Sequence, residues 1–135
     1  ILLTSLKDND NYFTWEKTFH SIKKLSLNIK KYTNKGDRCL LISENRPEWF
    51  ITDLSVMLSE AITVPAYTTY AEKDYEYIIE NCNPKLIFVS NQEQFNKVKN
   101  IIRNKNFIKK VFSFENLENV NKNECENLNN LLTLI

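Results

Sequence analysis

The sequence predicts an α/β fold, in which alternating strand–helix units form a mostly parallel sheet with helices on both faces. From residue 14 to residue 114, segments with helical spacing of apolar residues alternate with short apolar runs, as is typical of parallel sheets. The run Leu86 to Val89 is unbroken and apolar, as expected of a strand buried on both faces. The length of 135 residues is sufficient for one domain with a single core.

The first predicted helix covers residues 14–32, where apolar side chains recur mostly at steps of three and four. Thr14 is expected to cap its amino end. A turn at residues 34–37 follows, and it contains Gly36, the single glycine of the chain, which can adopt a positive φ. The apolar run at residues 38–43 then predicts the first buried strand.

The polar stretch Ser43 to Trp49 has the chemistry of a helix start. Asn45 is expected to be the N-cap, with Glu48 three positions later completing a capping box. Pro47 falls in the first turn, where its missing N–H costs nothing. These features favour a structural cap over a catalytic loop, and the helix is expected to reach about Ala61. Its buried side is expected to comprise Phe50, Leu54, Met57, Leu58 and Ala61.

The same pattern then repeats. Residues 62–64 predict a short strand that Pro65 stops, and the polar-aromatic loop Tyr67 to Tyr70 follows it. A helix is expected from about Glu72 to Cys82, where Asn83 and Pro84 break it. The strand at 86–89 comes next, and Ser90 and Asn91 are expected to cap a further helix.

A fourth strand is predicted at residues 108–114. We expect residues 1–114 to form one subdomain and residues 115–135 to be a tail of the same subdomain. The tail is hard to place, because it is rich in Asn and Glu. A final amphipathic turn is expected from four apolar residues, Leu128, Leu131, Leu132 and Ile135.

Ligands of such sheets bind at the carboxyl ends of the strands. That edge is expected to carry Ser43 to Arg46, Tyr67 to Tyr70 and Ser90 to Gln92. Within the middle segment, Tyr67, Thr68 and Thr69 are candidates for a wall of a substrate cleft. The alternative, which we favour, is a loop whose tyrosines pack on neighbouring helices.

Composition excludes several kinds of site. The formal net charge of +1 offers no strong field for nucleic acid or an anionic membrane. With one glycine, the chain cannot build a Walker loop, a GxGxxG turn or a GxSxG elbow. Residues that bind a nucleotide phosphate must therefore lie outside this sequence.

The cysteines and the single histidine predict neither a metal site nor a nucleophile. Cys39, Cys82 and Cys125 are far apart, without a CxxC pair, and His20 has no partner motif. We expect reduced, buried structural thiols. No apolar run approaches the roughly 18 residues of a spanning helix, and no signal peptide is evident, so the expected location is the cytoplasm.

Three segments, read together, resemble the amino-terminal region of AMP-forming acyl-CoA synthetases. They are FTWEKTFHSIKKLSLNIKK, KGDRCLLISENRPEWFITDLSVMLSEAITVPAYTTY and DYEYIIENCNPKLIFVSN. A KGD turn, a strand, NRPEW and then VPAY one helix later form a distinctive series. TTY followed by DYEYII is similar to the long-chain fatty acid–CoA ligase branch of the adenylate-forming superfamily. The resemblance runs from about Tyr12 to Asn91, and more loosely to about Phe114.

The resemblance implies a two-step reaction in the full-length enzyme. A fatty acid carboxylate attacks the α-phosphate of ATP to give acyl-AMP and pyrophosphate, and the thiol of CoA then displaces AMP. Magnesium accompanies the ATP. The family's phosphate loop, nucleotide-binding residues and catalytic lysine come after the region seen here. We therefore expect no catalytic, cofactor-binding or metal-binding residue in this chain, no tight binding of ATP or CoA to it, and no activity of the chain alone.

Several expectations about partners and origin follow. The partners implied by the resemblance are the remainder of the same enzyme chain and a fatty acid; peripheral membrane contact and a homodimer of the full enzyme stay open. The chain begins with Ile1 rather than methionine, which indicates a trimmed amino end or a partial gene. One departure from the family is Glu60, where a glycine is usual, and it puts the tightness of that turn in doubt.

Two alternatives stay open from the sequence. The first is a stand-alone doubly wound binding module of the receiver-like or flavodoxin-like type. A receiver would need an acidic cluster after its first strand, and the single Glu44 supports this poorly. The second is a truncated or decayed gene product without activity.

Overall fold

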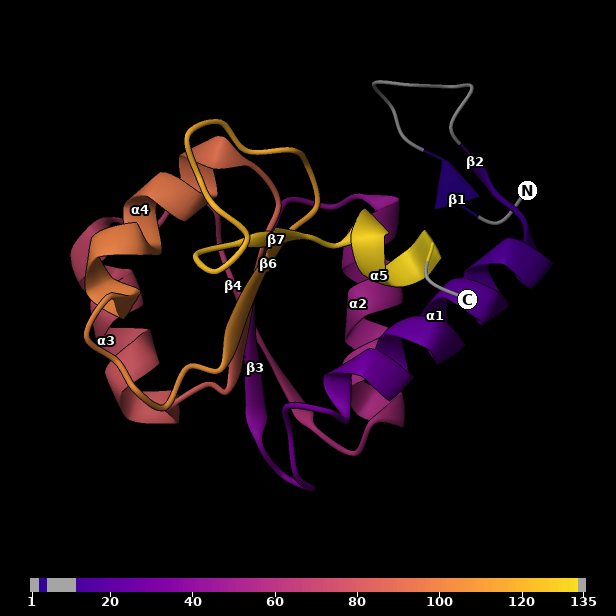
Figure 1. The fold of residues 1–135 in the computed structure, drawn as a ribbon, viewed down its shortest axis with the longest axis horizontal. Helices are drawn as coiled ribbons and strands as arrows, with labels where there is room; N and C mark the ends of the chain where they lie inside the picture. Colours follow the sequence, from indigo (N-terminus) through magenta and orange to yellow (C-terminus); the bar gives the residue numbers. More distant parts are fainter. Residues whose placement is uncertain (1–2, 5–11, 134–135) are drawn as a thin grey trace.

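A computed structural model describes residues 3–4 and 12–133 of the chain. Its centre is a parallel sheet of five strands in the order β4-β3-β5-β6-β7 (Figure 1). The strands are β3 (Arg38–Ile42), β4 (Ile62–Ala66), β5 (Leu86–Val89), β6 (Lys110–Ser113) and β7 (Glu126–Asn127). The predicted fold class, a mostly parallel sheet with helices on both faces, is confirmed.

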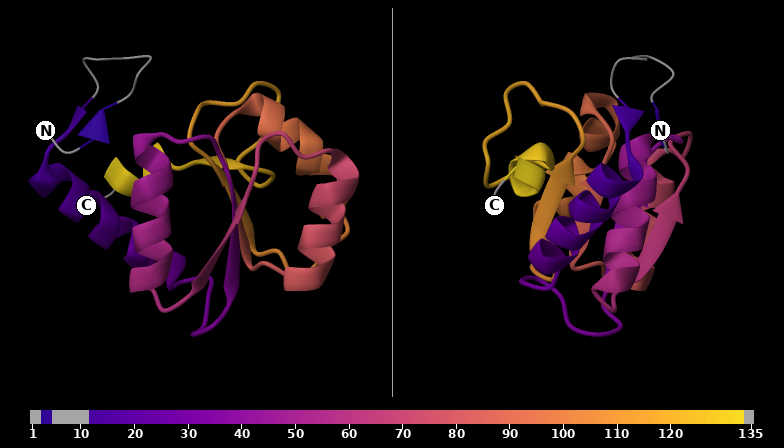
Figure 2. Two further views of the ribbon diagram at one scale, coloured as in Figure 1. Left: turned by 180° about the vertical axis from the view of Figure 1, so that it is seen from behind. Right: turned by 90° about the vertical axis from the view of Figure 1, so that its right-hand side faces the viewer.

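Helices cover both faces of the sheet (Figures 1 and 2). One face carries α1 (Trp15–Ile29), α2 (Pro47–Leu58) and α5 (Asn129–Thr133). The other face carries α3 (Glu72–Cys82) and α4 (Gln92–Ile102). Side chains of β5 show how this arrangement divides the core: Leu86 and Phe88 pack toward the first face, and Ile87 and Val89 toward the second. Successive residues of a strand point to opposite faces of the sheet. Because helices cover both faces, all four side chains are fully buried.

A second, antiparallel sheet pairs β1 (Leu3–Thr4) with β2 (Tyr12–Phe13). This pair is not predictable from the sequence, because strands of two residues are too short to show a periodicity. Phe13 is buried in the core on the α1 side of the central sheet, so β2 joins the small sheet to the main body.

Three helix ends are built as their sequences predict. The backbone N–H of Lys17 donates to the Thr14 hydroxyl at 3.1 Å, which caps α1. The backbone N–H of Gln94 donates to the Asn91 side chain at 3.2 Å, which caps α4. Helix α3 ends at Asn83, whose φ of 46° is in the left-handed region that asparagine tolerates.

The expected buried side of α2 is wrong at three positions, and α2 ends at Leu58 rather than at Ala61. Ala61 is buried as expected, and Leu54 is half-buried. The side chains of Met57 and Leu58 are 53% and 55% exposed, and Phe50 is also exposed. The buried residues of α2 are Pro47, Ile51, Thr52, Ser55 and Val56. Small polar residues lie in this face because α2 packs closely on α1, and the Ser55 hydroxyl donates to the carbonyl of Ile22 at 3.2 Å.

Pro65 does not stop β4, which continues through it to Ala66. Pro65 is aligned with Leu41 of β3, and β4 is an edge strand with no neighbour on its other side among the described residues. An edge position tolerates proline because its missing N–H is not needed by a second neighbour.

The unusual turn at Glu60 forms without glycine. Glu60 has a φ of 68°, and the turn is tied by hydrogen bonds from Glu60 N–H to the Met57 carbonyl (3.0 Å) and from Ala61 N–H to the Val56 carbonyl (3.1 Å). Gly36 N–H also donates to the Glu60 carbonyl at 2.9 Å. The turn is therefore closed by backbone hydrogen bonds although a glutamate holds a positive φ, a conformation that is strained for a residue with a Cβ.

The tail after residue 115 belongs to the same core. Strand β7 pairs with β6, and α5 packs on α1. Leu128 and Leu131 are buried in the core on that face, and Leu132 packs against it. Ile135, the fourth residue of the expected amphipathic turn, lies outside the described residues.

Candidate functional site

The switch point of the sheet lies between β3 and β5. From β3 the chain crosses to β4 through α2 on one face, and it then returns past β3 to β5 through α3 on the other face. The carboxyl ends of two such strands diverge into loops that lead to opposite faces, and ligands of open α/β sheets bind at this place. The loops that meet here begin at Ser43 and at Ser90.

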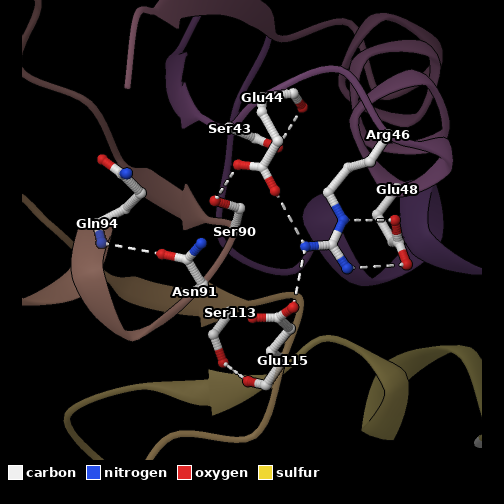
Figure 3. Close-up of polar contacts among 9 residues, drawn as sticks. All are labelled: Ser43, Glu44, Arg46, Glu48, Ser90, Asn91, Gln94, Ser113 and Glu115. Atoms are coloured by element: carbon white, nitrogen blue, oxygen red, sulfur yellow. Dashed lines mark hydrogen bonds and ion pairs between the residues drawn. The ribbon is translucent and has the colours of Figure 1, made fainter. Parts of the chain in front are cut away.

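A polar network joins these loops (Figure 3). The Ser90 hydroxyl, after β5, donates to the Glu44 carboxylate, after β3, at 2.8 Å. The sequence predicted that these two segments share an edge, and the structure brings them into direct contact. Burial alone would raise the pKa of Glu44, but hydrogen bonds from its own backbone, from Ser90 and from Arg46 outweigh it and hold the pKa below its ordinary value.

Arg46 is the centre of the network. Its guanidinium donates to both carboxylate oxygens of Glu48, at 2.8 Å and 3.4 Å, and to Glu44 at 3.3 Å. It also donates to Glu115, after β6, at 3.4 Å, and it lies 5.7 Å from the ring centre of Phe114. Burial would lower the pKa of Arg46, but the bonds and charges of the three carboxylates raise it. The cation thus links the ends of β3 and β6, and the Ser90–Glu44 bond adds the end of β5.

The predicted capping box at the start of α2 is wrong. The N-cap is Arg46 in an extended conformation, without a side-chain cap bond, and Pro47 is the first helical residue. Glu48 pairs with the Arg46 side chain instead of reaching back to a backbone N–H. With Arg46 as the N-cap, Glu48 is the second helical residue and not the third, which is the position of the glutamate in a capping box.

Two serine hydroxyls at this edge of the sheet donate hydrogen bonds to nearby backbone carbonyls. Ser43 donates to the Glu44 carbonyl at 2.7 Å, and Ser113 donates to the Glu115 carbonyl at 2.7 Å. Neither serine faces a histidine or lysine base, so the pattern of a nucleophile beside its base is not formed by these two residues. Chemically, the network is suited to holding the loops in place.

Sequence reasoning missed Glu115 and Ser113 as members of the network. Their only signal was position: Ser113 is near the end of the predicted fourth strand, and Glu115 follows that strand directly, at the same edge of the sheet. Glu115 lies 69 positions from Arg46 in the sequence, so the pairing depends on the strand order, which the sequence pattern alone does not specify.

The loop with Tyr67, Thr68 and Thr69 follows β4 at the same edge of the sheet, one strand farther out. Tyr67 is 71% exposed, whereas the Tyr70 ring packs edge-to-face on Tyr75 of α3. The polar contacts of the loop go to α3 and α4 rather than to Arg46. The expected packing on helices therefore holds for Tyr70 and fails for Tyr67.

The cysteines and His20 have the surroundings of structural residues. Burial raises the pKa of Cys39 to about 12 and that of Cys125 to about 11, and Cys82 at the end of α3 is half-buried. His20 is exposed, 3.9 Å from Glu16. In the described part of the chain, no three His, Cys, Asp or Glu side chains could hold a metal ion together.

A groove of about 660 Å³ lies on the outer side of the sheet edge, between α4 and the loop that precedes β7. Its lining includes four cationic side chains, Lys99, Arg103, Lys109 and Lys110, and two anionic ones, Glu118 and Glu124. Lys110 is already paired with Glu126 at 3.4 Å, and we assign no ligand to this groove.

Comparisons with known proteins decide the family. The sequence profile of the family described as AMP-binding enzyme matches residues 3–130. This chain belongs to the AMP-binding enzyme family. The family predicted from the motifs is therefore confirmed, and the receiver-like or flavodoxin-like alternative is not favoured.

Relatives of this AMP-binding chain include named acyl-CoA ligases. It is 30% identical to the long-chain-fatty-acid–CoA ligase ACSBG2 of Xenopus laevis over 74 residues, which are 55% of this chain and 10% of that protein. It is 25% identical to long chain acyl-CoA synthetase 3 of Arabidopsis thaliana over 114 residues, which are 84% of this chain and 17% of that protein. The chain thus spans only 10% to 17% of the length of these relatives.

Solved structures show the same fold. Coronafacic acid ligase from Pectobacterium brasiliense matches with a TM-score of 0.80 and 16% identity, over 93% of this chain and 25% of that one. The anthranilate CoA ligase AuaEII matches with a TM-score of 0.76 and 18% identity, over 91% of this chain and 22% of that one. Within the described residues, none of the helices has the length and apolar character needed to cross a membrane.

Proposed function

We propose that this chain is the amino-terminal part of a long-chain fatty acid–CoA ligase. The observation that carries the proposal is the family match over residues 3–130, together with relatives named as long-chain acyl-CoA ligases. The whole enzyme would join a fatty acid carboxylate to the α-phosphate of ATP, with release of pyrophosphate. The thiol of CoA would then attack the acyl carbon of acyl-AMP, with release of AMP.

In this proposal the chain supplies a scaffold and not the reacting groups. ATP, Mg²⁺ and CoA bind mainly through residues outside it, because its single glycine cannot form a phosphate-cradling loop. The Arg46 network supports this role, since Arg46 pairs with three carboxylates and ties the segment after β3 to the loop after β6. The chain alone would catalyse neither step.

We assign Tyr67, Thr68 and Thr69 to a wall of the substrate cleft in the whole enzyme. The assignment is supported by the position of the loop at the carboxyl edge of the sheet and by the open ring of Tyr67. Replacing Tyr67 with alanine in the whole enzyme should raise the KM for the fatty acid at unchanged stability. An effect on stability alone would show that the ring serves packing only.

The remainder of the same enzyme chain is the expected partner of the exposed side of α2 and the edge of β4. Met57, Leu58 and Ile62 form an exposed apolar group there, and the relatives are many times longer than this chain. A cytoplasmic location belongs to the same proposal, with peripheral membrane contact and a homodimer as further options. Vesicle sedimentation and light scattering of the longer protein test these two options separately.

Thioester formation tests the proposed function. The longer protein, incubated with ATP, Mg²⁺, CoA and palmitate, should produce palmitoyl-CoA detectable by mass spectrometry. Omitting CoA should leave only acyl-AMP and pyrophosphate. A folded longer protein that forms no thioester with any saturated fatty acid of medium or long chain would refute the assignment.

A further inference from the structure

Two side-chain donors, one buried and one half-buried, hold the main chain of the loop between β4 and α3. The Tyr75 hydroxyl donates to the Tyr67 carbonyl at 2.5 Å, and the Lys97 ammonium donates to the Thr68 carbonyl at 2.6 Å. Tyr75 belongs to α3 and Lys97 to α4. Two successive carbonyls of the loop are thus tied to two different helices.

Both donors are themselves held in place. The side chain of Tyr75 is fully buried, and its hydroxyl also lies 3.5 Å from the Gln94 side-chain oxygen. Burial raises the pKa of Tyr75 to about 12, so the phenol keeps its proton and remains a donor at neutral pH. Lys97 is additionally 3.9 Å from Glu93 on the preceding turn of α4, and its bond to a carbonyl is charge-assisted.

Three tyrosine rings, two from the loop and one from α3, pack in a row, and the outermost ring, Tyr67, is exposed to solvent. Tyr70 packs edge-to-face on Tyr75, with ring centres 6.0 Å apart, and Tyr67 packs edge-to-face on Tyr70 at 5.4 Å. Tyr67 nevertheless remains 71% exposed. A fixed main chain that presents an open aromatic ring is pre-organised for an apolar contact.

We propose that Tyr75 and Lys97 are positioning residues that hold the Tyr67–Thr69 loop where it contacts the apolar chain of the fatty acid. The inference rests on the proposed function, because it takes this loop as a wall of the acyl cleft. Residues 67–70 carry no charge, and the Lys97 charge is directed at a loop carbonyl. The loop is therefore suited to an acyl chain rather than to the phosphates of ATP.

The test replaces Lys97 with methionine in the longer protein and measures steady-state kinetics for both substrates. Losing one charge-assisted bond should raise the KM for the fatty acid about tenfold. The kcat and the KM for ATP should change less than about twofold. Lys97→Arg keeps a cationic donor and should recover most of the affinity.

Lys105→Met is the matched control. The Lys105 and Lys97 side chains are similarly exposed, at 24% and 25%, but Lys105 pairs with Glu80 at 3.2 Å and does not touch the loop. Hydrogen–deuterium exchange gives a readout independent of activity. The amides of residues 67–71 should exchange faster in Lys97→Met than in the wild type, and unchanged in Lys105→Met. Tyr75→Phe, which removes only the hydroxyl, should reproduce the effect and decides the matter if Lys97→Met does not fold.

The outcomes separate this inference from the proposed cleft. If Tyr67→Ala raises the KM for the fatty acid while Lys97→Met and Tyr75→Phe do not, the positioning role is overturned and the cleft assignment survives. If the KM for the fatty acid is unchanged in all three variants, both the cleft assignment and the positioning role fail.

Discussion

Arg46 is the residue on which most of the switch-point contacts converge. Its guanidinium bonds to Glu44, Glu48 and Glu115, which come from three segments of the chain. The side chain is largely buried, so water cannot replace these bonds fully. Three carboxylates would repel one another in its absence, and the loops after β3 and β6 would lose their link.

Replacing Arg46 with methionine should therefore lower the free energy of unfolding by about 2 kcal/mol. Urea denaturation followed by tryptophan fluorescence measures this. Lys122→Met is the control, because the Lys122 side chain is 75% exposed and Glu126 keeps a second cation, Lys110, at 3.4 Å. The exposed Lys122 contact should therefore contribute only about 0–1 kcal/mol. An equal loss of unfolding free energy in the two variants would show that the Arg46 network does not stabilise the fold.

Glu60 is a residue where the chain accepts strain. Its positive φ of 68° costs a residue with a Cβ more than it costs glycine. Glu60→Gly should therefore raise the free energy of unfolding by about 1 kcal/mol. Asn83→Gly, also at positive φ, should change it by only a few tenths of a kcal/mol, because asparagine tolerates this region. A stability loss in Glu60→Gly would contradict the strain argument.

Glu44 gives the fold a defined response to acid. Its pKa in the folded chain lies below the ordinary value of 4.5, so the folded state favours the ionised form. The stabilisation is complete above the ordinary pKa and is lost as pH falls through the folded pKa. The unfolding free energy of Glu44→Gln should therefore depend less on pH below about 4.5 than that of the wild type. Parallel pH profiles would mean that Glu44 is not stabilised as an anion.

At the scale of elements, features set by local sequence signals could be predicted, whereas features set by tertiary packing could not. Helix α3 could be predicted because Glu72 to Cys82 has helical spacing and a break at Asn83. The buried side of α2 could not, because close packing on α1 selects Thr52 and Ser55 over larger apolar residues. In the same way, the edge of the candidate site followed from strand–helix alternation. The pairing of Arg46 with Glu115, after β6, could not be predicted without knowing the strand order.

The tail shows how short elements join a core without a strong signal. Strand β7 has two residues and α5 has five, yet Leu128 is almost fully buried. Leu128→Ala should lower the free energy of unfolding by about 2–4 kcal/mol. Asn123→Ala, at an exposed position of the same tail, should have almost no effect. A neutral Leu128→Ala would show that the tail is not part of the folded unit, contrary to the predicted domain boundaries.

At the scale of the whole molecule, fold and function come from different observations. Counted along the chain from β3, the strand order is 2-1-3-4-5, which is also the order of flavodoxin-like folds. Topology therefore does not separate a ligase part from a flavodoxin-like module. The family profile over residues 3–130 does. Motifs such as NRPEW predicted the family because they mark the strand–helix junctions of its fold; that they hold no reacting group is part of our proposal.

Fatty-acid-dependent release of pyrophosphate from ATP tests the central claim most directly. The measurement compares the purified chain of residues 1–135 with the longer protein of which we propose it is the first part. We expect release by the longer protein only, at a rate that depends on the fatty acid, and none by residues 1–135 alone. Turnover by the isolated chain, or a folded longer protein that releases no pyrophosphate with any fatty acid, would contradict the account.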